Sequence, residues 1–377
     1  MQSSFVFKDC LSDNIYQKRK RVSLIVSHFC DTKCSFCYIK AKGERYMSLD
    51  IAKRIVVGAL ESAIQEVDFN LIGAEPLNCF GMIKQLCEWT WSQNWSVPYV
   101  FHVSTNGILL DKEMKEWFSK NKKRIILRLS YSGRSVLSKH NSEVKLPDFN
   151  FFVNNWGDIP IRYAICEANV KFLSFDIVEL SQLGAKVELG YTYGEAPWKR
   201  QSYETFYRQL LDISNKIKDN KIKCNIDFVS LDIGKLFLPE QEAITSYCGM
   251  YDNYRVFDYD GKRYVCPFFS PFILSKSKFL CCEEDFINGK CDRELCNECE
   301  IKCICPKCPG LSYCFSDSPF HKDVNACILL HYQVLANFSI LEGTVKRQES
   351  LSPKDIENIK IIKSKKIKLL EVIKHVN

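Results

Sequence analysis

Three cysteines near the start of the chain are spaced as ligands of one metal centre. Cys30, Cys34 and Cys37 are separated by three and then two residues, and they follow an apolar run at 21–28. Three thiolates on one short loop can bind three irons of a four-iron cluster and leave the fourth iron without a protein ligand. Such an open metal position favours catalysis, whereas structural metal sites are closed. The spacing alone also allows zinc with a distant fourth ligand.

An iron with an open position could bind the amine and carboxylate of a methionine group. Electron transfer into the adjacent sulfonium would then break a carbon–sulfur bond and yield a 5′-deoxyadenosyl radical. In such chemistry the cofactor performs the reaction, while the protein orients it and excludes water. The first cysteine group therefore predicts a radical reaction if iron rather than zinc binds there.

Cysteine is also unusually frequent in the rest of the chain. There are 20 cysteines, and 12 of them lie between Cys248 and Cys327. No apolar signal segment opens the sequence, so we expect a cytoplasmic protein whose thiols stay reduced. Clustered reduced cysteines are typical ligands of iron–sulfur clusters or zinc. We therefore interpret this second group as metal-binding rather than as a disulfide framework.

The overall composition excludes several classes of partner. The 377 residues are 46% hydrophobic and 26% charged, as in ordinary globular proteins. No apolar run reaches ~18 residues, so we expect no membrane span. The formal net charge of +7 is modest, and its basic runs at 17–21 and after Val345 are typical of solvated surfaces. We therefore expect no nucleic-acid partner.

The elements that must position the cysteines follow a repeating pattern. Helices are expected to begin near Ser48, Asp111 and Ser202, and one is expected to end at Gly184. No clear helix follows the fourth strand within 134–160. Six β–α repeats predict a parallel sheet, and active sites in such sheets lie at the carboxyl ends of the strands. The predicted strands cover 21–28, 68–76, 99–107, 124–133, 161–169 and 185–194.

The pattern changes after about Leu238, where aromatic residues, proline and cysteine dominate until about Ala326. We interpret this part as a small domain that metal clusters stabilise instead of a hydrophobic core. The last stretch has the pattern of a basic amphipathic helix. The predicted organisation is a lead segment at 1–20, an α/β unit at 21–238, a cysteine-rich domain at 239–335 and a basic helical tail at 336–377.

Several motifs resemble those of the radical S-adenosylmethionine superfamily. The sequence CDTKCSFCY at 30–38 resembles the family's cluster-binding signature, and GAEP at 73–76 resembles its GGEP motif. STNG at 104–107 and SYSG at 130–133 resemble two further elements near the cofactor, although Ala74 and Ser132 depart from the family pattern. The resemblance implies a partial (β/α)6 barrel. It also implies that S-adenosylmethionine contacts Gly73, Glu75, Ser104, Asn106 and Ser130.

The second cysteine group resembles the SPASM domain, which holds auxiliary four-iron clusters. Cys248 is followed by twelve residues, Gly261, four residues and Cys266, as at the start of that domain. The resemblance implies three [4Fe–4S] clusters in all. The first auxiliary cluster would use Cys248, Cys266 and Cys308, and the second would use Cys296, Cys299, Cys305 and Cys327.

Three questions about these ligands stay open. One spacing is a residue shorter than the family pattern, so Cys303 competes with Cys305. The first auxiliary cluster has no obvious fourth ligand, and the remaining cysteines of this region are unassigned: Cys281, Cys282, Cys291 and Cys314. A zinc module is the alternative, although its paired cysteines usually flank a longer loop.

Two extra clusters favour an oxidation, because a substrate radical must lose another electron to form a new bond. SPASM proteins characteristically act on peptides, so we expect a maturase that crosslinks side chains of a ribosomally made precursor peptide through thioether or carbon–carbon bonds. The first alternative is a sulfatase-maturase-like enzyme that makes formylglycine. That family has an acidic residue after the second SPASM cysteine, whereas Pro267 follows Cys266 here. The second alternative is a non-catalytic electron carrier.

The expected partners follow from this chemistry. They are the precursor peptide and an external electron donor such as flavodoxin or ferredoxin. Only 29 residues precede Cys30, too few for a peptide-binding domain, so a separate leader-binding protein or β-addition at an edge strand could recognise the precursor. No catalytic base is evident. Side chains that could face the cavity are Arg162, Glu167, Tyr191 and Tyr193, while His28 beside the cluster loop is expected to be structural.

Overall fold

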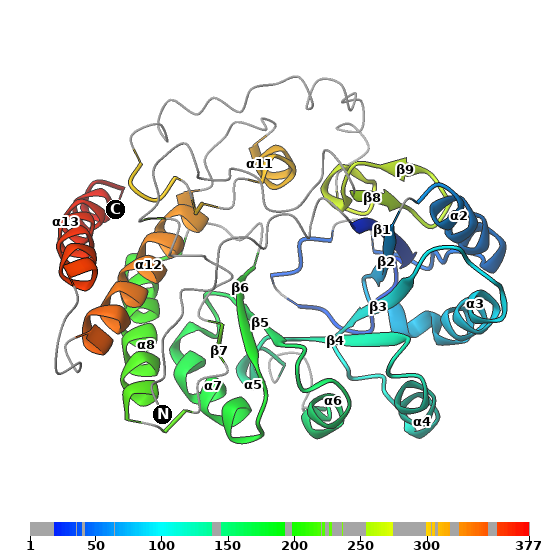
Figure 1. Cartoon of the computed structure of the whole chain (residues 1–377), viewed down its shortest axis with the longest axis horizontal. Coiled ribbons are helices and arrows are strands. Elements are labelled where there is room, and N and C mark those ends of the chain that lie inside the picture. The colour runs from blue at the N-terminus through cyan, green and yellow to red at the C-terminus, as the bar shows by residue number, and fades with distance from the viewer. Residues whose placement is uncertain are drawn as a thin grey trace.

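The structure is a computed structural model in which most of the described chain forms one α/β unit (Figure 1). It describes residues 19–34, 36–39, 42–63, 65–137, 145–192, 198–219, 221–222, 226–227, 236, 254–273, 299–302, 304–305, 308–316, 324–345 and 353–376. Within these residues one curved sheet has the strand order β7-β6-β5-β4-β3-β2-β1-β8-β9. Its strands are β1 (Arg19–Ser27), β2 (Glu66–Gly73), β3 (Tyr99–Thr105), β4 (Ile125–Tyr131), β5 (Ile161–Ile165), β6 (Val187–Tyr191), β7 (Ile226–Asp227), β8 (Tyr254–Phe257) and β9 (Arg263–Tyr264).

The first six strands pair in chain order and are all parallel, so the predicted α/β fold with a mostly parallel sheet is confirmed. Helices follow these strands and cover the outer face of the curved sheet (Figure 1). They are α2 (Leu49–Glu61), α3 (Phe80–Ser92), α4 (Lys112–Lys120), α5 (Arg134–Leu137), α6 (Phe149–Trp156), α7 (Leu173–Gln182) and α8 (Arg200–Lys218), with short 3-10 turns η2 (Pro76–Cys79) and η3 (Val170–Phe172).

Local sequence explains where several helices begin. Ser48 caps α2 by accepting from the amide of Ile51, and Asp111 caps α4 in the same way, as predicted. Asp148 caps α6, one of two short helices in the region after β4 where the sequence shows no clear helical pattern. The helix at 134–160 escapes prediction because it is split into pieces of four and eight residues.

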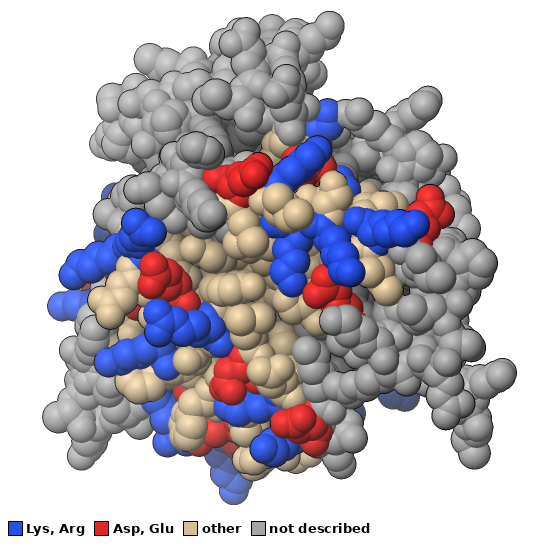
Figure 2. Space-filling model, turned by 90° about the vertical axis from the view of Figure 1, so that its left-hand side faces the viewer, with Lys and Arg blue, Asp and Glu red and all other residues tan. Residues whose placement is uncertain are grey.

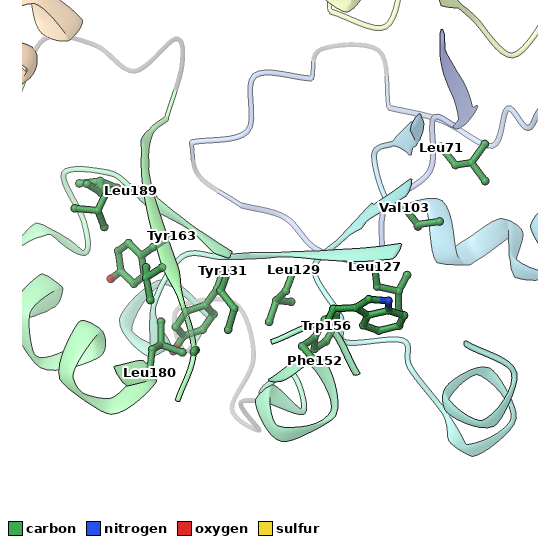
Figure 3. Close-up of a cluster of buried hydrophobic side chains, with 14 of the residues drawn as sticks. Leu71, Val103, Leu127, Leu129, Tyr131, Phe152, Trp156, Tyr163, Leu180 and Leu189 are labelled. Carbon is green, nitrogen blue, oxygen red and sulfur yellow. The ribbon is translucent and has the colours of Figure 1, made fainter. Parts of the chain in front are cut away.

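Strict alternation of side chains separates the two faces of the sheet. Along β4 the residues Ile125, Leu127, Leu129 and Tyr131 are buried against the helices, while the residues between them are more exposed. Figure 3 shows Leu127 and Leu129 pointing toward Phe152 and Trp156 of α6. The hydrophobic core therefore lies between the sheet and its helices, and the inner face is left for polar side chains.

One strand ends earlier than predicted, and another strand was not predicted at all. The fifth strand was expected over 161–169, but it ends at Ile165 because the Asn169 side chain accepts from the Cys166 amide and turns the chain. Strand β8 is an unpredicted neighbour of β1, running parallel to it. It is only four residues long and includes Arg255, so its pattern cannot be distinguished from the aromatic-rich sequence around it.

The C-terminal part packs against the α/β unit through helices. The described helices are η6 (Pro267–Phe269), α11 (Pro309–Ser316), α12 (Val324–Val345) and α13 (Pro353–Val376). Helix α12 packs on α8, α13 packs on α12, and α12 is continuous across the predicted boundary at 335/336. Ile301 and Ile304 are buried in the main hydrophobic core. No helix in the described ranges is long and apolar enough to span a membrane.

Ion pairs hold the basic helix α13 in place. Glu300 accepts from Lys365 at 2.9 Å and from Lys368 at 2.6 Å, and Lys366 pairs with Glu342 of α12 at 3.3 Å. Basic and acidic side chains are accordingly interspersed on the face shown in Figure 2. The lysines of α13 thus stabilise packing next to Cys299, since Glu300 follows that cysteine directly.

Candidate functional site

The predicted cluster loop starts directly beyond the carboxyl end of β1. All three cysteines are partly buried, and Thr32 lies between the first two of them. Its hydroxyl is 3.1 Å from the Cys30 sulfur and 3.7 Å from the Cys34 sulfur. The Cys37 amide donates to the Cys34 carbonyl at 3.1 Å, which closes a tight turn. The loop therefore gathers the three side chains at one end of the sheet.

The donor set of this loop fits an iron–sulfur cluster. It offers three thiols from one short segment, and in the ranges described no three His, Cys, Asp or Glu side chains converge on a single metal ion. Burial raises the pKa of the Cys30 and Cys34 thiols, although the nearby Lys42 ammonium partly opposes this. Binding to a cluster would therefore release protons from these thiols.

The GAEP segment is hydrogen-bonded to the residues that precede the cluster loop. Ala74 donates its amide to the Ser27 carbonyl at 2.9 Å, and Glu75 donates to the Phe29 carbonyl at 3.0 Å. A Cβ atom at Gly73 would lie 2.4 Å from the Ser27 carbonyl oxygen, which real structures do not tolerate. Gly73 is therefore required for the close approach of β2 to β1 at this edge.

The Glu75 side chain joins the same segment to the end of β3. It is 1% exposed, and its Oε1 accepts from the Thr105 hydroxyl at 2.7 Å and from the Leu77 amide at 3.0 Å. Its Oε2 accepts from the Asn106 amide at 2.9 Å. The Asn106 side chain in turn accepts from the Ile108 amide at 2.9 Å. The GAEP and STNG motifs are thus parts of one buried hydrogen-bond network.

Burial raises the pKa of Glu75 from 4.5 to about 7, because the cost of desolvation exceeds the stabilisation by the three donors. The carboxyl group is completely enclosed, so its visible role is to align two strand ends. The predicted contact of Glu75 with S-adenosylmethionine stays a prediction.

Two arginines and two serines line the inner face beyond these motifs. Ser104 and Ser130 are exposed on this face, as are Arg128 and Arg162. Ser130 is the register partner of Arg162, and the Arg162 guanidinium lies against Gly190, where a Cβ atom would be 3.0 Å from Nε. Hydroxyl and guanidinium donors at the carboxyl ends of strands are suited to binding a carboxylate. Ser104 and Ser130, which were both predicted to contact S-adenosylmethionine, therefore lie on the same face of the sheet.

A buried hydrogen bond between His28 and Asp258 connects the cluster loop to the β8–β9 hairpin. His28 Nε2 lies 2.6 Å from Asp258 Oδ1, and both side chains are essentially unexposed. The His28 ring also packs edge-on against Tyr259 and tilted against Phe272. His28 therefore has the structural role that its position predicts, and Asp258 is a partner that sequence patterns could not reveal.

The first auxiliary group of cysteines is only partly described. Cys266 is 5% exposed, and a Cβ atom on Gly310 would lie 3.1 Å from its sulfur. Gly310 is the second residue of α11, and Cys308 directly precedes this helix, so Cys266 and Cys308 lie at the same end of it. Cys314, which the sequence leaves unassigned, donates to the carbonyl of Phe268 at 3.1 Å. It is therefore a third thiol in this neighbourhood.

The second auxiliary group meets the sheet at the end of β6. Cys305 is close enough to the buried Tyr191 to contribute to the raised pKa of that phenol, although burial is the larger cause. The Tyr191 hydroxyl donates to Gln333 of α12. Cys327 lies on the same helix, 3.7 Å from His331 Nδ1. Tyr191 thus connects the barrel with helix α12 rather than pointing freely into a cavity.

The other predicted residues either have a different role or lie outside the described residues. Glu167, a candidate for the cavity, accepts from the Lys199 amide at 2.9 Å and the Ser202 hydroxyl at 2.7 Å. It therefore fixes the start of α8. Predictions about Cys248, Cys296, Cys303 and Tyr193 lie outside the described residues, as do those about the unassigned Cys281, Cys282 and Cys291.

Sequence comparisons identify no relative of this chain. No protein-family model matches it, and no curated protein matches it in sequence. The fold of this chain, in contrast, is similar to that of solved radical S-adenosylmethionine enzymes, the class whose motifs the sequence resembles.

Two of these structures are relevant to the predicted functions. One is anSMEcpe, an anaerobic sulfatase-maturating enzyme with bound AdoMet; it is 16% identical, with a TM-score of 0.63 over 91% of this chain and 98% of that one. The other is Streptococcus suis SuiB bound to the precursor peptide SuiA; it is 15% identical, with a TM-score of 0.57 over 82% of this chain and 76% of that one. At these identities the similarity establishes the fold alone.

Glu75 predicts a pH dependence of folding stability. Between pH 4.5 and about 7 the folded protein keeps a proton on Glu75 that the unfolded chain has released. The free energy of unfolding should therefore be highest below pH 4.5. It should fall by about 3 kcal/mol as the pH rises from there through about 7. Denaturant titrations of the wild type and Glu75→Gln at several pH values measure this as a difference. A difference that is independent of pH would contradict the raised pKa.

The contact between His28 and Asp258 predicts that loss of the Asp258 carboxylate strongly lowers the stability of the fold. Replacing Asp258 by Ala leaves His28 buried without this partner and should lower the free energy of unfolding by about 3 kcal/mol. Asp260→Ala is the matched control: its carboxylate is exposed and accepts from the Lys262 amide, so its loss should cost below about 1 kcal/mol. Equal urea midpoints for the two variants would show that the buried pair does not stabilise the fold.

Proposed function

We propose that this protein is a radical S-adenosylmethionine enzyme that oxidatively modifies side chains of a ribosomally made precursor peptide. The observation that carries the proposal is the hydrogen-bonded junction beside the cluster loop. There, the backbone of the GAEP segment binds Ser27 and Phe29, and Glu75 binds the STNG segment. An electron carrier has no need for a junction that joins three strand ends beside the cluster loop.

Cys30, Cys34 and Cys37 would hold the catalytic [4Fe–4S] cluster in this proposal. When bound and reduced from outside by flavodoxin or ferredoxin, that cluster supplies the electron that cleaves S-adenosylmethionine. The three thiolates would come from one loop, and the fourth iron would then have no protein ligand. Free thiols at all the described cysteines agree with the reducing cytoplasm in which we place the protein.

The protein's own polar groups would orient S-adenosylmethionine at the strand ends. Gly73 keeps β2 close to the cluster loop, and Asn106 lies in the turn that Glu75 fixes. Ser104, Ser130 and the adjacent Arg162 offer donors along the inner face. In this arrangement Glu75 acts mainly by positioning the Asn106 turn, since its own oxygens are occupied.

The remaining cysteines would hold two auxiliary [4Fe–4S] clusters that remove the second electron from the substrate. Cys248, Cys266 and Cys308 are assigned to the first, and Cys314 becomes a candidate for its missing ligand because it packs near Cys266. The second uses Cys296, Cys299, Cys305 and Cys327. The influence of Cys305 on the pKa of the Tyr191 phenol supports a position of this cysteine near the end of β6.

A peptide substrate is supported by the fold neighbours, since structures of anSMEcpe with the Cp18Cys peptide and of SuiB with its precursor peptide have this fold. Formation of formylglycine is the second candidate function, because anSMEcpe has the higher TM-score of the two. Against it, Pro267, Phe268 and Phe269 form an apolar turn directly after Cys266, where that chemistry would require an acidic residue. We therefore favour crosslinking.

The cluster loop predicts reductive cleavage of S-adenosylmethionine. Anaerobically reconstituted protein with a strong reductant should form 5′-deoxyadenosine, and Cys34→Ala should abolish its formation because the cluster loses one of three thiolates. Cys87→Ala is the matched control, since Cys87 is a fully buried cysteine of α3 and should leave the product yield unchanged. Wild-type protein that forms no 5′-deoxyadenosine, with its iron content confirmed, would refute the enzymatic proposal.

The proposed oxidation predicts a defined mass change in the peptide. Coexpression with candidate small peptides, followed by mass spectrometry, should show a loss of two hydrogens for each crosslink. Cys266→Ala and Cys299→Ala should still permit formation of 5′-deoxyadenosine but should prevent this loss, because the auxiliary clusters then lack a ligand. An aldehyde derived from cysteine would instead establish the formylglycine reaction.

A further inference from the structure

A groove lies on the outer face of the sheet, between helix α2 and the β8–β9 hairpin. Its volume is about 820 Å³, and neither the cluster loop nor the auxiliary cysteines contribute to its lining. The register explains its origin: Val22 of β1 pairs with Arg255 of β8, so both point to the outer face. Helix α2 covers β1, whereas no described helix crosses over β8 and β9. The uncovered strip beside α2 is the groove.

The groove has an apolar floor, and there is open space beside the wall that α2 forms. Val22 and Ile55 are buried at its base, and Phe257 extends the floor along β8. Gly261 closes one end, because a Cβ atom there would lie 3.1 Å from Ile51 of α2. At Gly58 on the wall formed by α2, an added Cβ atom would meet nothing within 4 Å. The groove is therefore roomy enough for an extended segment of another chain.

Positive charge dominates the rim. Lys20, Arg54, Arg255 and Arg263 line the groove, against the two carboxylates Glu66 and Asp260. Glu66 is already paired with Arg19 at 2.8 Å. In the described part of the chain, Lys20, Arg54 and Arg255 form no ion pair with a carboxylate. Burial and repulsion by Arg255 lower the pKa of Lys20, as expected when cations are brought together without a counterion.

We propose that this groove binds an acidic, extended segment of the precursor peptide, outside the residues that are modified. The inference rests on the proposed function, because it names the surface that recognises the substrate of that reaction. Carboxylates of such a segment would neutralise the cationic rim, and its apolar side chains would cover Val22, Ile55 and Phe257. Recognition of the peptide would thus take place on the face of the sheet opposite to the chemistry.

A defined probe tests the charge of the groove. The probe is a fluorescein-labelled decapeptide in which Glu alternates with Leu, and its control peptide has Lys in place of Glu. Fluorescence anisotropy should show micromolar binding of the acidic peptide and none of the basic one, with weaker binding as salt increases. Arg54→Glu should weaken binding at least tenfold. The matched control is Lys360→Glu, which makes the same change on an exposed position of α13.

A second pair of variants tests the space without changing charge. Gly58→Phe should fill the groove and weaken binding at least tenfold, whereas Gly58→Ala should bind like the wild type. Both substitutions improve helix propensity within α2, so neither should unfold the protein. Binding that is equal in Gly58→Phe and Gly58→Ala would overturn the assignment. Displacement of the peptide by micromolar pyrophosphate would also overturn it, in favour of a phosphate ligand.

Formation of 5′-deoxyadenosine separates the two proposals. Gly58→Phe and Arg54→Glu leave the cluster loop intact and should form it at the wild-type rate. If the wild type forms 5′-deoxyadenosine but the acidic peptide does not bind in the groove, the groove proposal alone fails. If it forms none while peptide binding in the groove follows the expected pattern, the enzymatic proposal fails and the binding site remains.

Discussion

The carboxylate of Glu75 is the constraint on which the arrangement of the site depends. It is enclosed at the carboxyl edge of the sheet, where its two oxygens accept from Leu77, Thr105 and Asn106. The backbone of the same segment binds the chain just before Cys30. Three neighbouring strand ends are thus held together by one short segment. A buried network with every member satisfied rigidifies a site, whereas a missing partner would leave a costly buried group.

The C-terminal region is tied to this edge by polar contacts rather than by the sheet alone. Asp258 reaches His28 beside the cluster loop, and Gln333 of α12 accepts from Tyr191 at the end of β6. In each of these contacts the two partners are more than a hundred residues apart in the sequence. They bring the neighbourhood of the auxiliary cysteines to the same end of the barrel as the cluster loop. In the proposed function, that proximity would allow transfer of a second electron from a bound substrate.

Sequence patterns predicted the six parallel strands and the order of the motifs, because alternating apolar residues and strand-end motifs are local signals. They could not predict that Glu75 is enclosed, since its partners belong to another strand. Glu167 was expected near the cavity but caps α8, because a carboxylate after a strand is equally suited to either role. Strand β8 and its groove beside α2 were missed because they depend on long-range pairing with β1.

In the proposed function, S-adenosylmethionine binds directly to an iron that the three thiolates leave open. Electron–nuclear double resonance of the reduced protein with carboxylate-labelled ¹³C S-adenosylmethionine measures that contact most directly. We expect a hyperfine coupling from the label in the wild type and none in Cys34→Ala. A reduced protein that binds the labelled cofactor without any such coupling would contradict the account.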